Sequence, residues 1–304
     1  MTNKKRKILK VISAVLSVVL SVALALSLVT TTLLSVGRDY LTSQEFNSMI
    51  DSTDLATMKF TYNGEKITLE KFVKDYVTEK IEDYIKNNPL SNYTNFLFPI
   101  FDSITDFTVD KALSSEYINT TIKGEVHSII DYFLHSNVKE AKERIKNGIT
   151  LENNVALNTD NAPTYEERIK AEVKIAVFKY IEEETGKSCD EIIVLLSEKN
   201  ISNLKTISLV LFALLLIASI PTFPSAFLFL DFVFIGFKGQ IYSCIVDFKE
   251  HFAGNEDLIS YELIKPLTDA YMPYADRAYN IGMIFSALYV VSLIIMYVIK
   301  KKKQ

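Results

Sequence analysis

Three stretches of the sequence are almost free of charged residues, and they organise the whole chain. They run from Ile8 to Val36, from Ile207 to Phe237 and from Asn280 to Ile299. About 20 helical residues cross a hydrocarbon core of roughly 30 Å, so each stretch is long enough to enter or span a membrane. The pattern predicts an all-α integral membrane protein with an N-terminal anchor helix over residues 8–36 and a last transmembrane helix over residues 278–299.

The middle apolar stretch contains two prolines, Pro221 and Pro224. Each proline removes a backbone donor and clashes with the preceding turn, so a break at Ile220–Pro224 is favoured. One unbroken helix over residues 204–237 would measure about 51 Å and overshoot the bilayer. We therefore predict a proline-turned helical hairpin over residues 205–237, with arms of about 15 residues that either span the membrane or re-enter it. A single kinked span is the alternative.

Basic residues at both chain ends predict the orientation in the membrane. The first ten residues carry five Lys or Arg, and Lys300–Lys303 follow the last apolar stretch. Short lysine-rich flanks of membrane helices stay in the cytoplasm. The cytoplasmic tails are then residues 1–7 and 300–304, and the parts outside are 37–204 and 238–277. A single kinked span would instead leave 238–277 inside. The first apolar run is too long for a typical signal-peptide core, so we interpret it as an uncleaved anchor, with removal as the alternative.

Residues 37–204 form the predicted extracytoplasmic domain, and its pattern is helical. Apolar residues recur at steps of three and four after Leu69, which predicts an amphipathic helix that ends before Pro89. The same spacing predicts one long helix over 115–146. The asparagine-rich stretch over 147–163 is typical of a loop. This domain holds 19 Lys or Arg against 29 Asp or Glu, so its net charge is −10.

Local signals add detail within this domain. Asn63-Gly64 lies between alternating apolar residues and favours a tight turn, which predicts a small β-hairpin. Capping boxes predict helix starts at Thr164 with Glu167 and at Ser188 with Glu191, and Gly186 is expected to end the helix between them.

The candidate metal ligands are His127, Asp131 and His135. Their four-residue spacing places them on one helix face, where neighbouring pairs could ligate a metal ion. The same face is polar and opposite the apolar one, and no third ligand is indicated, so we interpret it as a solvated helix surface. We expect no metal and no cofactor.

Asp231 is the candidate binding residue of the hairpin, together with Lys238. A carboxylate within a membrane segment costs about 2.5–3.5 kcal/mol, and such residues often face a pathway or a partner. The structural alternative is a position near the lipid headgroups or a role in the turn. Lys238 shares the helix face but lies about 10 Å away, too far for a direct ion pair without bending.

Small residues recur along the first and last membrane helices, where they allow helices to pack closely. They are Ser13, Ser17, Ser21 and Ala25 in the first helix, and Gly282 and Ser286 in the last. Self-association with a second copy is one interpretation, and packing within this chain is the other.

The sequence contains no recognisable catalytic constellation, and its two cysteines, Cys189 and Cys244, are expected to be free thiols unless they form one bridge. We expect a non-enzymatic protein whose outer domain binds a partner or senses the envelope. The alternative is a small transporter or channel component that uses the hairpin and Asp231; an envelope enzyme is a third hypothesis. The expected partners are the lipid bilayer and an unidentified protein, which could be a second copy; nucleic acid is not expected.

Overall fold

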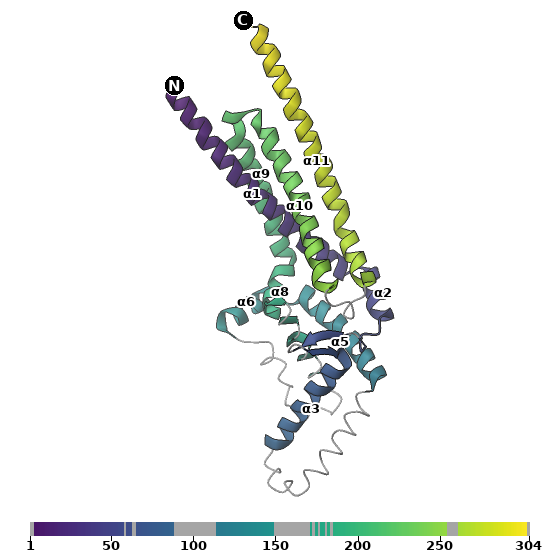
Figure 1. The fold of residues 1–304 in the computed structure, drawn as a ribbon. Coiled ribbons are helices and arrows are strands. Elements are labelled where there is room, and N and C mark those ends of the chain that lie inside the picture. Colours follow the sequence, from purple (N-terminus) through teal and green to yellow (C-terminus); the bar gives the residue numbers. More distant parts are fainter. Residues whose placement is uncertain are drawn as a thin grey trace. The chain divides into compact units, whose positions relative to one another are not determined.

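The computed structural model describes most of the chain, as Figure 1 shows. The described residues are 3–57, 59–62, 65–87, 114–148, 171, 174–175, 177–179, 181–182, 185–253 and 261–302. Within them the secondary structure is almost entirely helical. The elements are α1 (Asn3–Leu41), α2 (Gln44–Ser52), β1 (Lys59–Tyr62), β2 (Glu65–Thr68), α3 (Leu69–Asn87), α5 (Ser115–His135), α6 (Val138–Asn147), α8 (Cys189–Leu196), α9 (Glu198–Ser219), the 3-10 turn η3 (Ile220–Thr222), α10 (Ser225–Ala253) and α11 (Tyr261–Lys302).

The chain divides into two compact units. We call the first the apolar unit; it comprises residues 1–40, 198–251 and 264–304, and therefore contains α1, α9 and most of α10 and α11. We call the second the polar unit; it comprises residues 41–197 and 252–263. Most of the predicted outer domain, residues 37–204, belongs to the polar unit, while its location outside the membrane stays a prediction.

Four of the helices in the described residues are long and apolar enough to cross a membrane. The candidate spans are Lys5–Leu41, Glu198–Thr222, Ser225–Asp247 and Lys265–Lys302. Most side chains in them are exposed in the isolated chain, including the majority of the large apolar ones. Exposed apolar surface of this extent is unfavourable in water, which indicates association with a membrane.

The long helical run breaks where the two prolines predict it. α9 ends at Ser219, η3 contains Pro221, and α10 starts at Ser225. The arms are longer than the predicted 15 residues, because α9 has 22 residues and α10 has 29. Both helices continue past the apolar stretch into polar residues at the ends remote from the turn. These lengths correspond to about 33 Å and 44 Å, and each exceeds the roughly 30 Å of a hydrocarbon core. The length of the arms therefore gives no reason to expect a re-entrant loop.

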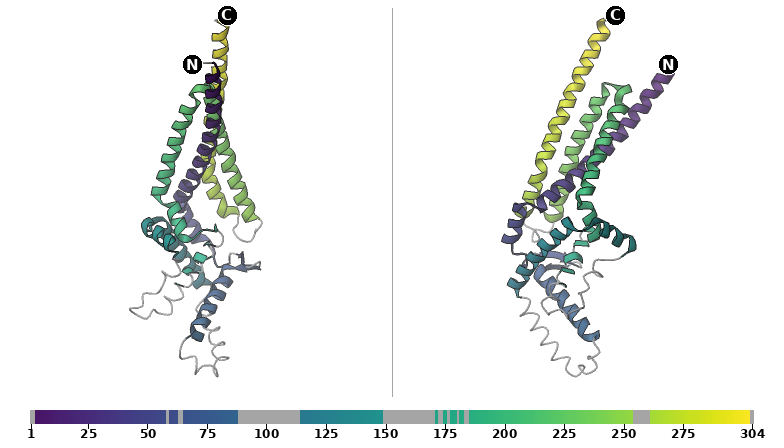
Figure 2. Two further views of the ribbon diagram at one scale, coloured as in Figure 1. Left: turned by 90° about the vertical axis from the view of Figure 1, so that its left-hand side faces the viewer. Right: turned by 180° about the vertical axis from the view of Figure 1, so that it is seen from behind.

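In the apolar unit, α1 and α10 run in one direction, and α9 and α11 run in the opposite direction (Figures 1 and 2). Figures 1 and 2 show that the start of α1, the end of α11 and the turn between α9 and α10 lie at the same end of this unit. At the other end, Arg38 near the end of α1 forms an ion pair with Glu198 at the start of α9, at 3.1 Å. Tyr271 of α11 also reaches α1 there, since its hydroxyl donates to the Leu33 carbonyl at 2.9 Å.

Two apolar cores hold these helices together. One core joins α1, α9 and α10 through Leu24, Ala25, Leu215, Leu230 and Val233. The other joins α1, α10 and α11 through Val29, Val36, Phe237, Ile241, Ile245, Tyr271, Ala275 and Ala278. α1 therefore contacts α9 from Ser13 to Arg38, and its second half also lies against α10 and α11.

The polar unit contains the small antiparallel sheet that the sequence predicts. β1 pairs with β2 in the register Lys59 to Thr68 and Tyr62 to Glu65. The turn residues Asn63 and Gly64 lie outside the described residues. Next to the sheet, α2, α3 and α5 share an apolar core of Ile50, Leu55, Ala56, Phe72, Val73, Ile118 and Ile122.

The predicted helix over 115–146 is wrong in one respect, because it is two helices. α5 ends at His135 and α6 starts at Val138. The Asn137 side chain caps α6 by accepting from the Lys139 amide at 3.0 Å, which favours a new helix start over continuation. α6 then ends at Gly148, whose φ of 63° is the left-handed conformation that favours glycine.

Two predicted boundary signals near residue 188 are present. Gly186 has a φ of 61°, and its amide donates to the Glu182 carbonyl, which ends the preceding helix. Ser188 and Glu191 form the predicted capping box at the start of α8. The other predicted box, Thr164 with Glu167, lies outside the described residues.

Candidate functional sites in the two units

Asp231 lies on the side of α10 that packs against α11. Its Oδ1 atom is buried and has no hydrogen-bond partner in the described part of the chain. Gly282 of α11 lies opposite, since a methyl group added there would meet Asp231 Oδ1 at 3.4 Å and Ile235 Cγ1 at 3.1 Å. The structure therefore brings together two residues that the sequence singled out separately. A buried carboxylate oxygen without a donor is costly, so this position needs a compensating interaction or a function.

Lys238 does not compensate Asp231. It forms an ion pair with Asp276 of α11 at 3.4 Å. Its ammonium also lies over the ring of Tyr279, 4.3 Å from the centroid, where a cation–π interaction is favourable. The two residues proposed as a binding pair thus face α11 at different positions: Lys238 forms an ion pair with Asp276, whereas Asp231 lies opposite Gly282.

Aromatic rings pack in the α10–α11 interface near Asp231 and Gly282. Phe285 of α11 stacks on Phe234 at 5.8 Å and on Phe227 at 6.4 Å, measured between ring centroids. Ser286 follows on α11 and is half-buried. The surroundings of the Asp231 carboxylate are therefore apolar where these rings pack, and close approach of α10 and α11 depends on the missing side chain at Gly282.

The small residues of α1 face α9. Ser13, Ser17, Ser21 and Ala25 are all buried. Ser13 donates to the Ala218 carbonyl, and the hydroxyls of Ser17 and Ser219 are 3.0 Å apart. The Ser21 hydroxyl instead donates to the Ser17 carbonyl within α1 at 2.7 Å.

A third interhelical contact extends this surface, with the Ser27 and Ser208 hydroxyls 2.8 Å apart. We call Ser13, Ser17, Ser27, Ser208 and Ser219 the serine seam. Such hydrogen bonds between membrane helices contribute on average about 0.6 kcal/mol each, so close packing contributes alongside them. In this structure the serines of α1 therefore face α9 of the same chain.

The histidine candidates have separate carboxylate partners. His127 Nε2 lies 3.1 Å from Asp51 Oδ1 of α2, and His135 Nδ1 lies 2.8 Å from Asp131 Oδ1. All of these side chains are at least one-third exposed. In the residues that the structure describes, no group of three or more His, Cys, Asp or Glu side chains is arranged to hold a metal ion.

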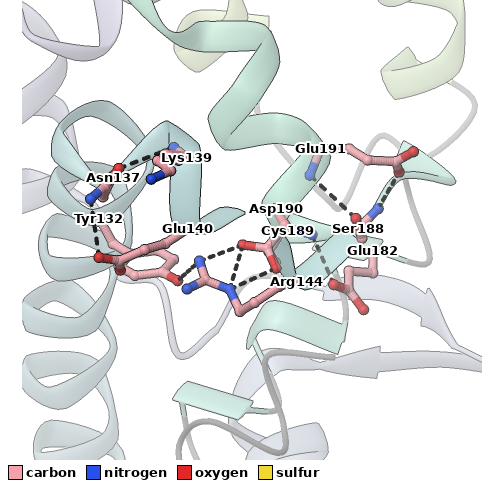
Figure 3. Close-up of polar contacts among 10 residues, drawn as sticks. All are labelled: Tyr132, Asn137, Lys139, Glu140, Arg144, Glu182, Ser188, Cys189, Asp190 and Glu191. Carbon is pink, nitrogen blue, oxygen red and sulfur yellow. Dashed lines mark hydrogen bonds and ion pairs between the residues drawn. The ribbon is translucent and has the colours of Figure 1, made fainter. Parts of the chain in front are cut away.

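A buried ion pair in the polar unit joins three helices (Figure 3). Arg144 of α6 binds both carboxylate oxygens of Asp190 of α8, with Nε–Oδ2 at 2.9 Å and Nη2–Oδ1 at 2.6 Å. Arg144 Nη2 also donates to the Tyr132 hydroxyl of α5 at 3.1 Å. The Asp190 side chain is only 4% exposed and that of Arg144 is 18% exposed. The hydrogen bonds that Arg144 donates to Asp190 raise the pKa of the Arg144 guanidinium.

Next to this pair, Cys189 is fully buried at the first position of α8. Its amide donates to Glu182 Oε1 at 2.8 Å, as Figure 3 shows. Burial, followed by the charge of Glu182, raises the pKa of the Cys189 thiol far above its usual range. A thiol with a raised pKa is a poor nucleophile, so Cys189 fits a structural role. Both cysteines are free thiols here.

The raised pKa of Cys189 predicts a loss of stability at alkaline pH. The thiol ionises near pH 8.5 in an unfolded chain but only at higher pH in the folded one. The contribution of the protonated thiol to the free energy of unfolding is therefore complete below pH 8.5. It decreases as the pH rises above that value, by up to about 1.4 kcal/mol per pH unit. We expect the free energy of unfolding of the polar unit to decrease with this slope between pH 8.5 and about 10. Urea denaturation of the detergent-solubilised full chain, monitored by protease sensitivity, measures it.

Matched alanine variants test the origin of that slope. Cys189→Ala should abolish it, whatever its effect on the stability at neutral pH, whereas Cys244→Ala should retain it. An unchanged slope in Cys189→Ala would show that another group is responsible. Tyr132 is the nearest such group, because burial raises the pKa of its hydroxyl while the charge of Arg144 offsets part of the effect.

The sequence analysis did not find the cluster of Tyr132, Arg144 and Asp190. Arg144 and Asp190 are 46 residues apart, and both belong to segments with many charged residues. One signal was present in the sequence. Asp190 is the second residue of a largely apolar helix that Ser188 caps, so its position on that helix could be assigned. The partner could not be chosen from the sequence, because several basic residues of 139–146 were equally suitable.

Comparisons with known proteins give no relative. No protein-family model, no curated protein and no solved structure matches the chain. The function therefore has to be inferred from the chain's own residues.

Proposed function

We propose that the chain is a multi-pass membrane protein with both termini in the cytoplasm and a non-enzymatic polar unit outside that binds a partner or senses the envelope. Four candidate spans would return the C-terminus to the side of the N-terminus. The common position of both chain ends in the apolar unit supports this arrangement (Figures 1 and 2). The net charge of −10 over residues 37–204 and of −4 over 247–277 agrees with a location outside.

The observation that carries the sensing role is the direct connection between α8 and α9. Only Ser197 separates the last residue of α8 from the first residue of α9. α8 is fixed to α5 and α6 by the Arg144–Asp190 pair, and α9 is fixed to α1 by the serine seam. A partner that binds near α8 would therefore bind close in sequence to the start of a candidate membrane helix.

Site-specific photocrosslinking on cells tests the binding role. Ile145 is the one exposed large apolar side chain within the described part of the polar unit, at 42% exposure, and is a suitable position for a photoreactive amino acid. Ile294 of α11, at 57% exposure, is the matched control in the apolar unit. We expect a discrete protein adduct from position 145 that is absent at position 294. If positions 142, 143 and 145 all give no adduct, the binding role is contradicted.

Transport is the second candidate, and the buried Oδ1 of Asp231 favours it. No donor in the described residues reaches that oxygen, and the other side chains of α10 that lie against Gly282 are the apolar Ile235 and Phe234. Intramembrane carboxylates of this kind often mark ion or solute pathways. In this hypothesis the hairpin of α9 and α10, packed against α11, contains the pathway.

Proton flux into pyranine-loaded proteoliposomes under an imposed potassium diffusion potential tests this candidate. Transport predicts flux with the unmodified chain, loss of flux in Asp231→Asn and unchanged flux in Asp269→Asn, an exposed carboxylate of α11. Flux equal to that of empty liposomes for all three proteins would contradict proton transport. The two candidate functions are therefore separated by independent measurements.

A further inference from the structure

Basic side chains gather at one end of the apolar unit. Lys5, Arg6, Lys7 and Lys10 lie on the first turns of α1, and Lys300, Lys301 and Lys302 lie on the last turn of α11; all are exposed. We call these seven residues the basic collar. Figures 1 and 2 show that both helix ends project at the same end of this unit, on the side of the turn between α9 and α10.

The basic collar has no acidic counterpart in the sequences that form this end. Residues 1–38, 199–230 and 277–304 contain no Asp or Glu. At the opposite end of the same helices the charges are mixed, since Arg38 pairs with Glu198 and Lys238 pairs with Asp276. Basic residues without neighbouring carboxylates therefore occur at the collar end of the apolar unit, whereas basic residues at the opposite end are interspersed with acidic ones.

The position of the collar relative to the apolar surface identifies the partner. Ile8, Leu9, Val11 and Ile12 are exposed directly after the basic residues of α1, and Val298 and Ile299 are exposed directly before those of α11. Exposed apolar side chains enter the hydrocarbon region, so the adjacent basic groups lie at the depth of the lipid headgroups. Long Lys and Arg side chains extend toward that interface.

We propose that the basic collar binds the phosphate groups of anionic phospholipids, and that the protein therefore retains such lipids selectively. Basic clusters next to membrane helices attract anionic headgroups, with an effect of roughly fivefold in affinity for each residue near the surface. The two helix ends would bind lipids on separate sides of the bundle. This inference requires only that α1 and α11 enter a membrane, and it does not depend on the partner-binding or transport roles.

Lipid retention by the purified full chain tests the proposal. The chain in dodecyl maltoside is mixed with micelles of equal phosphatidylglycerol and phosphatidylcholine and purified again, and the bound lipids are quantified by mass spectrometry. We expect phosphatidylglycerol to be enriched over phosphatidylcholine. The triple variants Lys300→Gln/Lys301→Gln/Lys302→Gln and Lys5→Gln/Arg6→Gln/Lys7→Gln should each lower this enrichment by about tenfold or more.

A control with the same change of charge uses the opposite end of the unit. Lys199, Lys205 and Lys265 are exposed near the starts of α9 and α11, and their triple glutamine variant should keep the enrichment. The proposal is overturned if collar and control variants retain the same lipids, or if the unmodified chain shows no enrichment. Displacement of phosphatidylglycerol by millimolar inorganic phosphate would also overturn it, because the collar would then be a site for soluble phosphate.

Discussion

Replacing Arg144 with methionine is expected to lower the free energy of unfolding of the polar unit by about 3–5 kcal/mol. The loss arises because Asp190 stays buried when Arg144 is replaced. Asp190 is 4% exposed, and without Arg144 its carboxylate has no cation and little access to water. The Tyr132 hydroxyl would also lose the donor that now lies at 3.1 Å. Urea denaturation of the detergent-solubilised full chain, followed by protease sensitivity of the polar unit, measures this loss.

A double variant and a surface pair complete this test. Arg144→Met combined with Asp190→Leu should be more stable than Arg144→Met alone, because apolar replacements often substitute for a whole buried ion pair at little cost. The exposed pair of Lys71 and Asp75, at 2.5 Å, is the matched control. The variant Lys71→Met should change stability far less than Arg144→Met, because exposed ion pairs contribute little. Equal effects of Arg144→Met and Lys71→Met would contradict the structural role of the buried pair.

Replacing Gly282 with leucine is expected to separate α10 from α11, at a cost of about 1–3 kcal/mol or more. Even a methyl group at Gly282 would lie 3.1 Å from Ile235 Cγ1 and 3.5 Å from Phe234 Cβ. The larger side chain would also disturb the stacking of Phe234 on Phe285. Thermal denaturation of the purified full chain in detergent, followed by loss of the monodisperse peak in size-exclusion chromatography, measures the change.

Gly239 provides the matched control for this substitution, because it lies in α10 and a methyl group there meets nothing within 4 Å. Gly239→Leu should leave the denaturation temperature nearly unchanged. A Gly282→Leu variant as stable as Gly239→Leu would show that α10 and α11 do not pack closely at this position. The same result would remove the burial of Asp231 Oδ1, and with it the observation that favours transport.

The long apolar helices were predictable because their signal is local. Long uncharged runs define them, and Pro221 with Pro224 defines the turn. Their ends were not predictable, because the helices continue into polar sequence once packing supports them. α9 begins at Glu198, which pairs with Arg38, and α11 includes Pro266 and Pro273. Hydropathy alone does not show where such helices end.

Contacts between distant residues were the other part that the sequence could not supply. The spacing of Ser13, Ser17 and Ser21 predicted a close helix contact, but only the structure shows that α9 occupies it. Asp231 and Gly282 were each recognised as unusual, yet nothing in the sequence placed them opposite one another. The break before Asn137 was missed because apolar spacing continues through it, while a single side-chain cap decides the start of α6.

Labelling of single cysteines on intact cells tests the proposed layout most directly. In a chain with Cys189→Ala and Cys244→Ala, new cysteines are placed at the exposed positions Lys142, Glu250 and Lys302 and treated with a maleimide that cannot cross membranes. The proposal predicts labelling of Lys142→Cys and Glu250→Cys on intact cells, and of Lys302→Cys only after permeabilisation. Labelling of Lys302→Cys on intact cells, together with protection of Glu250→Cys, would contradict it and support a single kinked span through α9 and α10.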